Sequence, residues 1–193
     1  MIMIIEKYKT IFVHIPKNAG TSVETLFKTN THVWDERLFN RHDTIHDIKS
    51  KLEINDDFRK NERYSEYSKF AIVRNPYDRM VSWYFFYNIR NLTLHAEDTS
   101  FNAFIKDPLV FNLFENTKLL YNPQHTWVDD TVTILKYENL KKELNELFGM
   151  EIDLPTVNKT KHKHYLDYYN QELLDIVYNK YKEDFEKFNY KKL

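Results

Sequence analysis

The chain has 193 residues, enough for one sizeable hydrophobic core and too few for two ordinary domains, so we expect a single domain over residues 1–193. Its hydrophobic fraction of 42% and charged fraction of 30% are those of a globular protein rather than a disordered one. A net charge of −1 excludes the global positive field by which proteins bind nucleic acid, so any anion must be bound by a local site.

The absence of cysteine excludes disulfides, thiolate metal sites and cysteine nucleophiles. The first residues are apolar for only a short run and lack the basic start and long apolar core of a signal peptide. No stretch approaches the roughly 20 apolar residues of a membrane span. These features predict a cytoplasmic protein without a membrane span, and they carry no signal for an oligomeric state.

Three short apolar runs rich in β-branched residues predict buried strands, and each is followed by a helical pattern. The strands are expected at 10–15, 69–73 and 131–136, and the helices at 21–28, 76–90 and 138–148, with further helices at 43–52, 101–106 and 170–181. Asn75 and Ser100 are natural N-caps, and Gly149 is a natural C-cap. Strands that alternate with helices favour an α/β fold with a central, mostly parallel sheet and helices on both faces.

The loop that follows the first strand has the chemistry of an anion site. Lys17 supplies a positive charge, Gly20 lets the backbone approach a ligand closely, and the amides of Thr21 and Ser22 open a helix whose dipole favours negative charge. The same residues would also be compatible with a plain strand–turn–helix connection in which Lys17 is merely solvated.

The second strand ends at another residue suited to anions. Arg74 follows this strand, where its planar guanidinium could clamp a phosphate, and Ser82 lies eight residues further on, off the main apolar stripe of the next helix. Alternatively, Arg74 pairs with Asp78 and Ser82 is a small packing residue. Because ligands of open α/β sheets bind beyond the carboxyl ends of the strands, two such ends predict a donor with two separated phosphate groups.

The order of residues argues against an ATP site of the Walker type. That loop requires lysine directly after a glycine, whereas Lys17 precedes Gly20 and the chain contains no Gly-Lys pair. The later strands end at Arg74 and Lys136 rather than at an aspartate that could hold magnesium. A divergent nucleotide kinase remains an alternative, as does a non-catalytic module that binds a nucleotide or a glycan.

Two segments carry a family resemblance. Residues 14–22, His-Ile-Pro-Lys-Asn-Ala-Gly-Thr-Ser, resemble the 5′-phosphosulfate loop of the Golgi-type carbohydrate sulfotransferases (sulfotransferase family 2) and their small microbial relatives. Residues 73–82, Val-Arg-Asn-Pro-Tyr-Asp-Arg-Met-Val-Ser, resemble the 3′-phosphate motif of that family. Weaker landmarks follow at Gln124, Trp127, 137–140, 154–155, Asn158 and 181–190. Asn18 replaces the threonine more usual after the lysine, and either side chain can donate to an oxyanion.

The resemblance implies a P-loop-NTPase-like three-layer fold and transfer of a sulfuryl group from 3′-phosphoadenosine 5′-phosphosulfate (PAPS) to an acceptor hydroxyl. The acceptor would be a small molecule or a carbohydrate, and no metal would be required. The 5′-phosphosulfate would be held by Lys17, Asn18, Ala19, Gly20, Thr21 and Ser22, and the 3′-phosphate by Arg74 and Ser82. Lys17 would also neutralise the charge that develops on the leaving phosphate.

In-line sulfuryl transfer needs a base for the acceptor hydroxyl, and a histidine titrates near the working pH. Of the eight histidines, His42 is our choice, because related small sulfotransferases carry a histidine at this place; His46, one helical turn later, is the second candidate. Asp43 or Asp47 could orient either ring. His42 and His46 also imitate the spacing of a zinc-binding pair, but no third ligand stands out, so we expect no metal.

The only basic cluster is Lys159, Lys161, His162, Lys163 and His164. It could close over the nucleotide or attract an anionic acceptor, or it could be a solvated loop, as charge runs usually are. Asn158, directly before this cluster, and Lys161, within it, are candidate nucleotide contacts. The region 91–130 carries no pattern that identifies the acceptor.

Overall fold

The computed structural model describes residues 3–28, 31–33, 40–54, 66–89, 98–107, 122–155, 157 and 162–193. The chain divides into two compact units. The first comprises Met1–Val73 and Gln124–Asn158, and the second comprises Arg74–Pro123 and Lys159–Leu193. The single domain expected from the chain length stays a prediction.

The first unit is built on a sheet with the strand order β3-β1-β2-β4-β5. Its described strands are β1 Met3–Ile5, β2 Thr10–Val13, β3 Thr31–Val33, β4 Ser68–Val73 and β5 Thr133–Lys136. Strand β4 pairs in parallel with β2 on one side and with β5 on the other, so Phe70 lies opposite both Phe12 and Thr133. Strand β1 pairs antiparallel with β2 and with β3.

The mixed α/β class with helices beside a central sheet is confirmed. The three strands expected from the sequence are all present, and they form the parallel part of the sheet. Strands β1 and β3 were not expected, because each has only three residues and shows no alternation that distinguishes it from a loop. The 3-10 turn η1 (Glu6–Tyr8) joins β1 to β2, and Lys9 closes it in the left-handed region with a φ of 46°.

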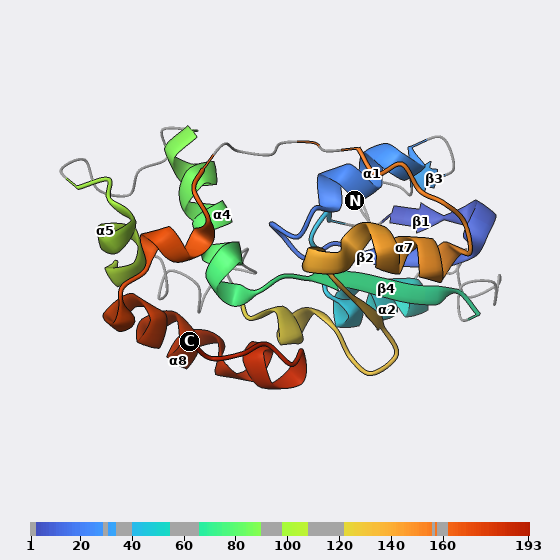
Figure 1. Ribbon diagram of the computed structural model, residues 1–193. Coiled ribbons are helices and arrows are strands. Elements are labelled where there is room, and N and C mark those ends of the chain that lie inside the picture. The colour runs from blue at the N-terminus through green and yellow to red at the C-terminus, as the bar shows by residue number, and fades with distance from the viewer. Residues whose placement is uncertain are drawn as a thin grey trace. The chain divides into compact units, whose positions relative to one another are not determined.

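Helices lie on both sides of the sheet in this unit. Figure 1 shows α1 (Gly20–Phe27) and α7 (Leu140–Phe148) on one side and α2 (Ile45–Ile54) on the other. The core beneath α1 and α7 consists of Met3, Ile5, Phe12, Val23, Phe27, Phe70, Ile72, Leu135, Leu140, Leu144 and Ile152. Because successive strand residues point to opposite faces, Ile4, Ile11 and Ala71 are left for the other side, where Ile45 and Ile48 of α2 are also buried.

Local hydrogen bonds explain where these helices begin and end. Thr44 and Asp47 form a reciprocal cap before α2: the Thr44 amide donates to Asp47 Oδ2 at 3.0 Å, and the Asp47 amide donates to Thr44 Oγ1 at 3.2 Å. Gly149 ends α7 in the left-handed region with a φ of 63°, and its amide donates to the Asn145 carbonyl. The predicted C-cap is confirmed, and 138–139 of the predicted helix belong to a 3-10 turn, η4 (Tyr137–Asn139).

The second unit contains α4 (Pro76–Ile89), α5 (Phe101–Lys106), the 3-10 turn η5 (Tyr165–Tyr168) and α8 (Gln171–Lys187). The predicted caps are confirmed, since Asn75 Oδ1 accepts from the Tyr77 amide at 3.0 Å and Ser100 Oγ accepts from the Ala103 amide at 3.1 Å. The buried core is largely aromatic: Tyr77, Met80, Val81, Trp83, Phe101, Ile105, Leu173, Val177, Tyr181 and Phe185.

Helix α8 continues beyond the expected end at residue 181. Tyr181 itself has a non-helical backbone, with φ −112° and ψ 22°, and the helix resumes after this kink to Lys187. Tyr181 is buried, and its hydroxyl lies 3.3 Å from Met80 Sδ. Among the helices that the structure describes, none has the length and apolar character needed to cross a membrane.

The left-handed end of α7 gives a stability prediction. Gly149→Ala should lower the free energy of unfolding by about 1 kcal/mol, because a Cβ disfavours this backbone conformation. Packing should contribute nothing, since no atom lies within 4 Å of an added Cβ. Gly149→Asn is the matched control and should lose less, because asparagine tolerates the left-handed region. Urea denaturation measures both, and equal stability of the alanine variant and the wild type would contradict the prediction.

Candidate functional site

The loop between β2 and α1 has an unusual backbone. Lys17 and Ala19 adopt left-handed conformations with φ values of 68° and 61°, whereas Asn18 between them does not. Non-glycine residues in this region are uncommon and cost about 1 kcal/mol or more each, so the surrounding structure must hold them there. Backbone of this kind, in which left-handed residues alternate with others, can turn successive amide groups toward one side, as in concave sites for anions. The amides at the start of α1 continue this site.

Gly20 is required by a neighbouring ring. A Cβ built on Gly20 would lie 1.8 Å from Nε2 of His14 and within 2.3 Å of two further ring atoms. The ring of His14 therefore packs directly on the Cα of Gly20, between the end of β2 and the first residue of α1. The glycine is thus required by a contact within the protein itself, and the close approach to a ligand expected at Gly20 stays a prediction.

Asn18 braces the loop from inside. Its Nδ2 donates to the carbonyl of Ile72 in β4 at 2.7 Å and to Oε1 of Gln124 at 2.7 Å. Both amide hydrogens are used in these bonds, and the buried Oδ1 has no partner among the described residues. In this structure the side chain thus donates to the protein rather than outward to an oxyanion, and the main chain is the part of Asn18 left for a ligand.

Two hydroxyl groups stand at the start of α1. Thr21 Oγ1 accepts from Nη2 of Arg41 at 3.1 Å, and Ser22 Oγ accepts from the amide of Val157 at 3.3 Å. A hydroxyl that accepts one bond still has its own hydrogen to donate. Both side chains therefore keep the donor that an anion in the loop needs. The side chain of Lys17, which begins the left-handed pair, is half-buried.

His42 is oriented by the backbone carbonyl of His14, the residue that follows β2. Its Nδ1 lies 3.0 Å from the carbonyl oxygen of His14, and the ring meets the His14 ring edge-on at 4.6 Å and the Trp127 ring at 6.3 Å. Because a carbonyl only accepts, Nδ1 carries the hydrogen and Nε2 is left as the proton acceptor. Burial, and to a lesser extent the neighbouring His14, lower the pKa of His42 to about 4. The ring is therefore neutral at physiological pH.

The carboxylates expected to orient the base have other partners. Oδ2 of Asp43 accepts from Lys51 Nζ at 2.5 Å and from the Asn40 amide at 2.9 Å, so this carboxylate fixes the turn that carries His42 rather than its ring. His46, the second candidate, lies on the exposed side of α2. His42 is hydrogen-bonded to His14, directly after β2, whereas His46 has no such bond among the described residues, and the choice between the two as a base stays a prediction.

An ion-pair network that was not predicted from the sequence joins Arg41, Glu24 and His14 next to the loop. Arg41 donates from Nε to Glu24 Oε1 at 3.0 Å, and its Nη2 bonds both Glu24 Oε2 and Thr21. Glu24 Oε1 also lies 3.0 Å from Nδ1 of His14. Burial raises the pKa of Glu24, but its bonds to His14 and Arg41 outweigh this and hold the pKa below the usual value. Burial lowers the pKa of His14, so its ring is neutral and donates to the carboxylate.

The second unit carries the other pair of expected phosphate ligands. Arg74 is buried, and its Nε donates to Oδ2 of Asp78 at 2.7 Å. Ser82 follows Asp78 by four residues in α4, so these two side chains share one row of the helix surface, and Arg74 reaches that row through its ion pair with Asp78. The structure thus places Arg74 and Ser82 on one flank and shows the pairing with Asp78 that the sequence left open.

A neighbouring arginine has a different role. Arg79 is fully buried, and its Nη1 donates to the Asn122 carbonyl at 3.0 Å. Burial lowers the pKa of Arg79, while Tyr181 and Asp184 oppose this shift. Because its guanidinium lies in the core of the second unit, Arg79 serves packing and charge balance there, although it lies within the sequence motif between Arg74 and Ser82.

Parts of the basic cluster lie outside the described residues. These are 158–161, which include the candidate contacts Asn158 and Lys161 and the start of the cluster at Lys159. Of the rest, His162 stacks on Phe85 with ring centroids 5.1 Å apart, and His164 Nδ1 accepts from the Leu166 amide at 3.4 Å. Both imidazoles therefore have partners within the second unit.

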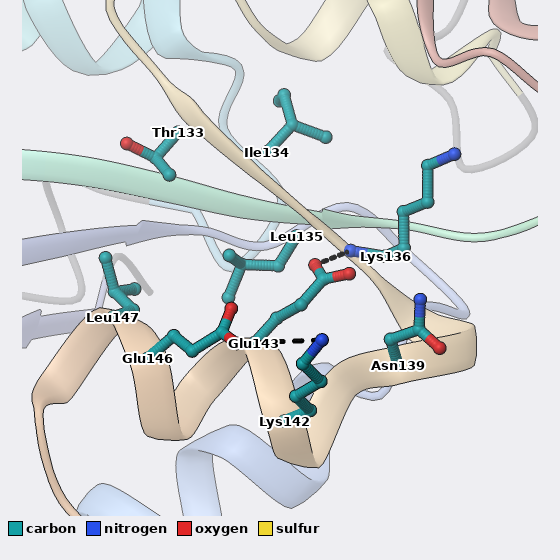
Figure 2. Close-up of a pocket in the computed structure, with 9 residues that line it drawn as sticks. All are labelled: Thr133, Ile134, Leu135, Lys136, Asn139, Lys142, Glu143, Glu146 and Leu147. Atoms are coloured by element: carbon teal, nitrogen blue, oxygen red, sulfur yellow. Dashed lines mark hydrogen bonds and ion pairs between the residues drawn. The ribbon is translucent and has the colours of Figure 1, made fainter.

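An open pocket of about 450 Å³ lies between β5 and α7 (Figure 2). Its charged groups already have partners: Glu143 Oε2 accepts from the Lys136 amide at 2.6 Å, and Lys142 pairs with Glu146 at 3.7 Å. No residue of the loop at 16–22 lines it. The pocket is therefore separate from the candidate site, whose parts are the loop, His14, Glu24, Arg41 and His42.

One comparison with known proteins identifies the family of the chain. Residues 1–131, about two thirds of the chain, match the model of a family described as the sulfotransferase family. The matched segment contains the loop, the turn with Arg41 and His42, and the motif with Arg74 and Ser82. Searches of the curated proteins and of the solved structures give no match. On the strength of the family match, the chain belongs to the sulfotransferase family, family 2.

Proposed function

We propose that the protein transfers a sulfuryl group from PAPS to an acceptor hydroxyl, on a small molecule or a carbohydrate, and that its fold is of the P-loop type. The observation that carries the proposal is the loop itself. A left-handed pair at Lys17 and Ala19 leads into the start of α1 in a chain of the sulfotransferase family. Near it lies a neutral histidine, His42, whose Nε2 has no hydrogen-bond partner among the described residues.

The loop would hold the 5′-phosphosulfate. Its binding groups would be the side chain of Lys17, the main chain of Asn18, Ala19 and Gly20, and the hydroxyls and amides of Thr21 and Ser22. Support comes from the concave backbone and from hydroxyl groups that keep their hydrogens. Arg74 and Ser82 would bind the 3′-phosphate. The Arg74–Asp78 pair fits this role, because Asp78 holds the guanidinium on the flank of α4 that also carries Ser82.

The reaction would be an in-line displacement at sulfur. The acceptor oxygen forms a bond to sulfur while the bond from sulfur to the bridging phosphate oxygen breaks, and adenosine 3′,5′-bisphosphate leaves. His42 Nε2 takes the hydroxyl proton, and Lys17 neutralises the negative charge that develops on the bridging oxygen. The electron pair of the broken bond stays on the leaving phosphate, so the step balances without a metal or a redox partner.

The low pKa of His42 fits a base that works beside an anion. In the ligand-free protein, burial holds the ring neutral and therefore ready to accept a proton. A phosphosulfate in the loop would place negative charge nearby and would raise the pKa of His42, because an opposite charge favours the imidazolium. Donor binding would thus strengthen the base at the stage at which it is needed.

The donor can be tested by binding alone. Adenosine 3′,5′-bisphosphate should raise the melting temperature without magnesium, because the proposed site uses only cations and amides of the protein. At about 100 times the dissociation constant, the stabilisation should reach about 2.7 kcal/mol. Differential scanning fluorimetry with the bisphosphate, with ATP and with ATP plus magnesium makes the comparison. If only ATP with magnesium stabilises the protein, it is a nucleotide kinase and the proposal is wrong.

Lys17→Ala tests the leaving-group role. The variant should lose turnover by about 100-fold or more, because the charge on the departing phosphate then lacks its cation. Its circular dichroism spectrum should match the wild type. Lys182→Ala, which removes an exposed lysine paired with Glu186 on α8, is the control for loss of one positive charge. Transfer of radiolabelled sulfate to a panel of sugars and alcohols provides the assay, and near-normal turnover of Lys17→Ala would remove Lys17 from catalysis.

His42→Ala tests the base, with His46→Ala as the matched control on α2. Only the His42 variant should lose transfer, by about 100-fold or more, while both variants still bind the bisphosphate. With limiting donor, the wild-type rate should be flat from pH 6 to pH 8, since a pKa lowered to about 4 keeps the ring neutral there, and should fall as the pH approaches that value. Loss of activity in His46→Ala instead would assign the base one helical turn later.

A further inference from the structure

Arg41 stands at the edge of the anion loop without a role in the proposed reaction. Its Nη2 touches Thr21 Oγ1 at 3.1 Å, and Thr21 belongs to the first turn of α1. The Arg41 side chain is 46% exposed, so solutes reach it, whereas that of Glu24 is 20% exposed. Nη1 makes no hydrogen bond to any residue that the structure describes. The partly exposed guanidinium of Arg41 therefore lies beside the Thr21 hydroxyl, which would donate to a phosphate oxygen.

Glu24 neutralises this guanidinium in the ligand-free protein. It accepts from both Nε and Nη2 of Arg41, a fork that matches the geometry in which arginine binds carboxylate or phosphate. Glu24 has a second partner in His14 Nδ1 at 3.0 Å. If Arg41 moved away, this hydrogen bond would remain, so the partly exposed carboxylate of Glu24 would still have a donor within the protein.

We propose that Arg41 is a ligand of the 5′-phosphate end of the donor, and that Glu24 holds its guanidinium beside the loop until the donor binds. The inference rests on the proposed function. A phosphate in the loop competes with Glu24 for the same planar donors, and the contact of Nη2 with Thr21 keeps the guanidinium within reach of both. Arg41 then adds a second cation to that of Lys17, from a different segment of the chain.

A purely structural role makes a different prediction. If the Arg41–Glu24 pair only fastens the turn that carries His42 onto α1, then removal of either partner breaks the same fastening, and both variants change in the same direction. If Arg41 is a ligand that Glu24 holds back, removal of Arg41 weakens donor binding and neutralisation of Glu24 strengthens it. Opposite signs therefore distinguish the two roles.

The test measures the dissociation constant of adenosine 3′,5′-bisphosphate by isothermal titration calorimetry. Arg41→Ala should raise it about tenfold, the usual loss for one charge-assisted hydrogen-bonding group, and Arg41→Lys should raise it less, because the charge remains without the fork. Glu24→Gln should lower it about threefold, since a neutral amide competes less for the guanidinium and still accepts from His14. Lys142→Ala, which removes an exposed cation on α7, is the charge-matched control and should leave it unchanged.

Each outcome decides one question. If the wild type does not bind the bisphosphate, the proposed function fails and the role of Arg41 fails with it. If the wild type binds but Arg41→Ala binds equally well, or if Arg41→Ala and Glu24→Gln both weaken binding, only the role of Arg41 is overturned. Circular dichroism checks the fold of each variant. Should Arg41→Ala not fold, Glu24→Gln decides alone: tighter binding supports the inference, and unchanged or weaker binding overturns it.

Discussion

The packing of the His14 ring on the Cα of Gly20 is the constraint on which the rest of the site depends. With the ring atoms about 2 Å from where a Cβ would stand, this contact admits no side chain at position 20. It brings the end of β2 against the start of α1 and leaves a short loop between them, two residues of which must turn left-handed. The strained backbone is thus a consequence of a tight connection, and the concave row of amides follows from it.

His14 also joins the loop to the groups that would do the chemistry. Its carbonyl accepts a hydrogen bond from Nδ1 of His42, and its own Nδ1 donates to Glu24. Glu24 in turn accepts from Arg41. One residue at a strand end therefore sets the tautomer of the proposed base and the position of a cation at the loop. The two histidines are adjacent, and both are kept neutral by burial, so neither repels the other. A charged pair in this position would cost stability, and neutrality removes that cost.

The sequence predicted the parts of the fold that follow from local patterns. The strands at 10–13, 68–73 and 133–136 are each built around a short run of apolar residues. The caps at Asn75, Ser100 and Gly149 follow from the side chain, or the lack of one, at each position. Strands β1 and β3 escaped prediction because three residues carry no readable period, and their pairing depends on partners distant in the chain. Helix α8 is kinked at Tyr181, where no proline or glycine is present, so the kink could not be predicted from the residue type.

The candidate site was predictable only in part, for the same reason. The loop motif at 17–22 is continuous in the sequence, so the anion-binding character of Lys17, Gly20, Thr21 and Ser22 could be predicted from residue types and order alone. Glu24 and Arg41 are 17 residues apart and look like ordinary surface charges until the fold brings them together. The opposite error arose at Asn18, whose amide suggested an outward donor. Whether such a group points inward or outward depends on Ile72 and Gln124, which lie 54 and 106 residues away.

The brace made by Asn18 has a consequence for the chemical durability of the enzyme. The two acceptors that its Nδ2 contacts are both oxygens, the carbonyl of Ile72 and Oε1 of Gln124. Loss of ammonia from this one amide would replace the donor with a carboxylate oxygen, which those two oxygens would repel. The new charge would also lie within a loop shaped to receive an anion, and burial would raise its energy further. A single deamidation at this position would therefore convert the protein into a form in which the loop has lost its support and repels the anion that it is proposed to bind.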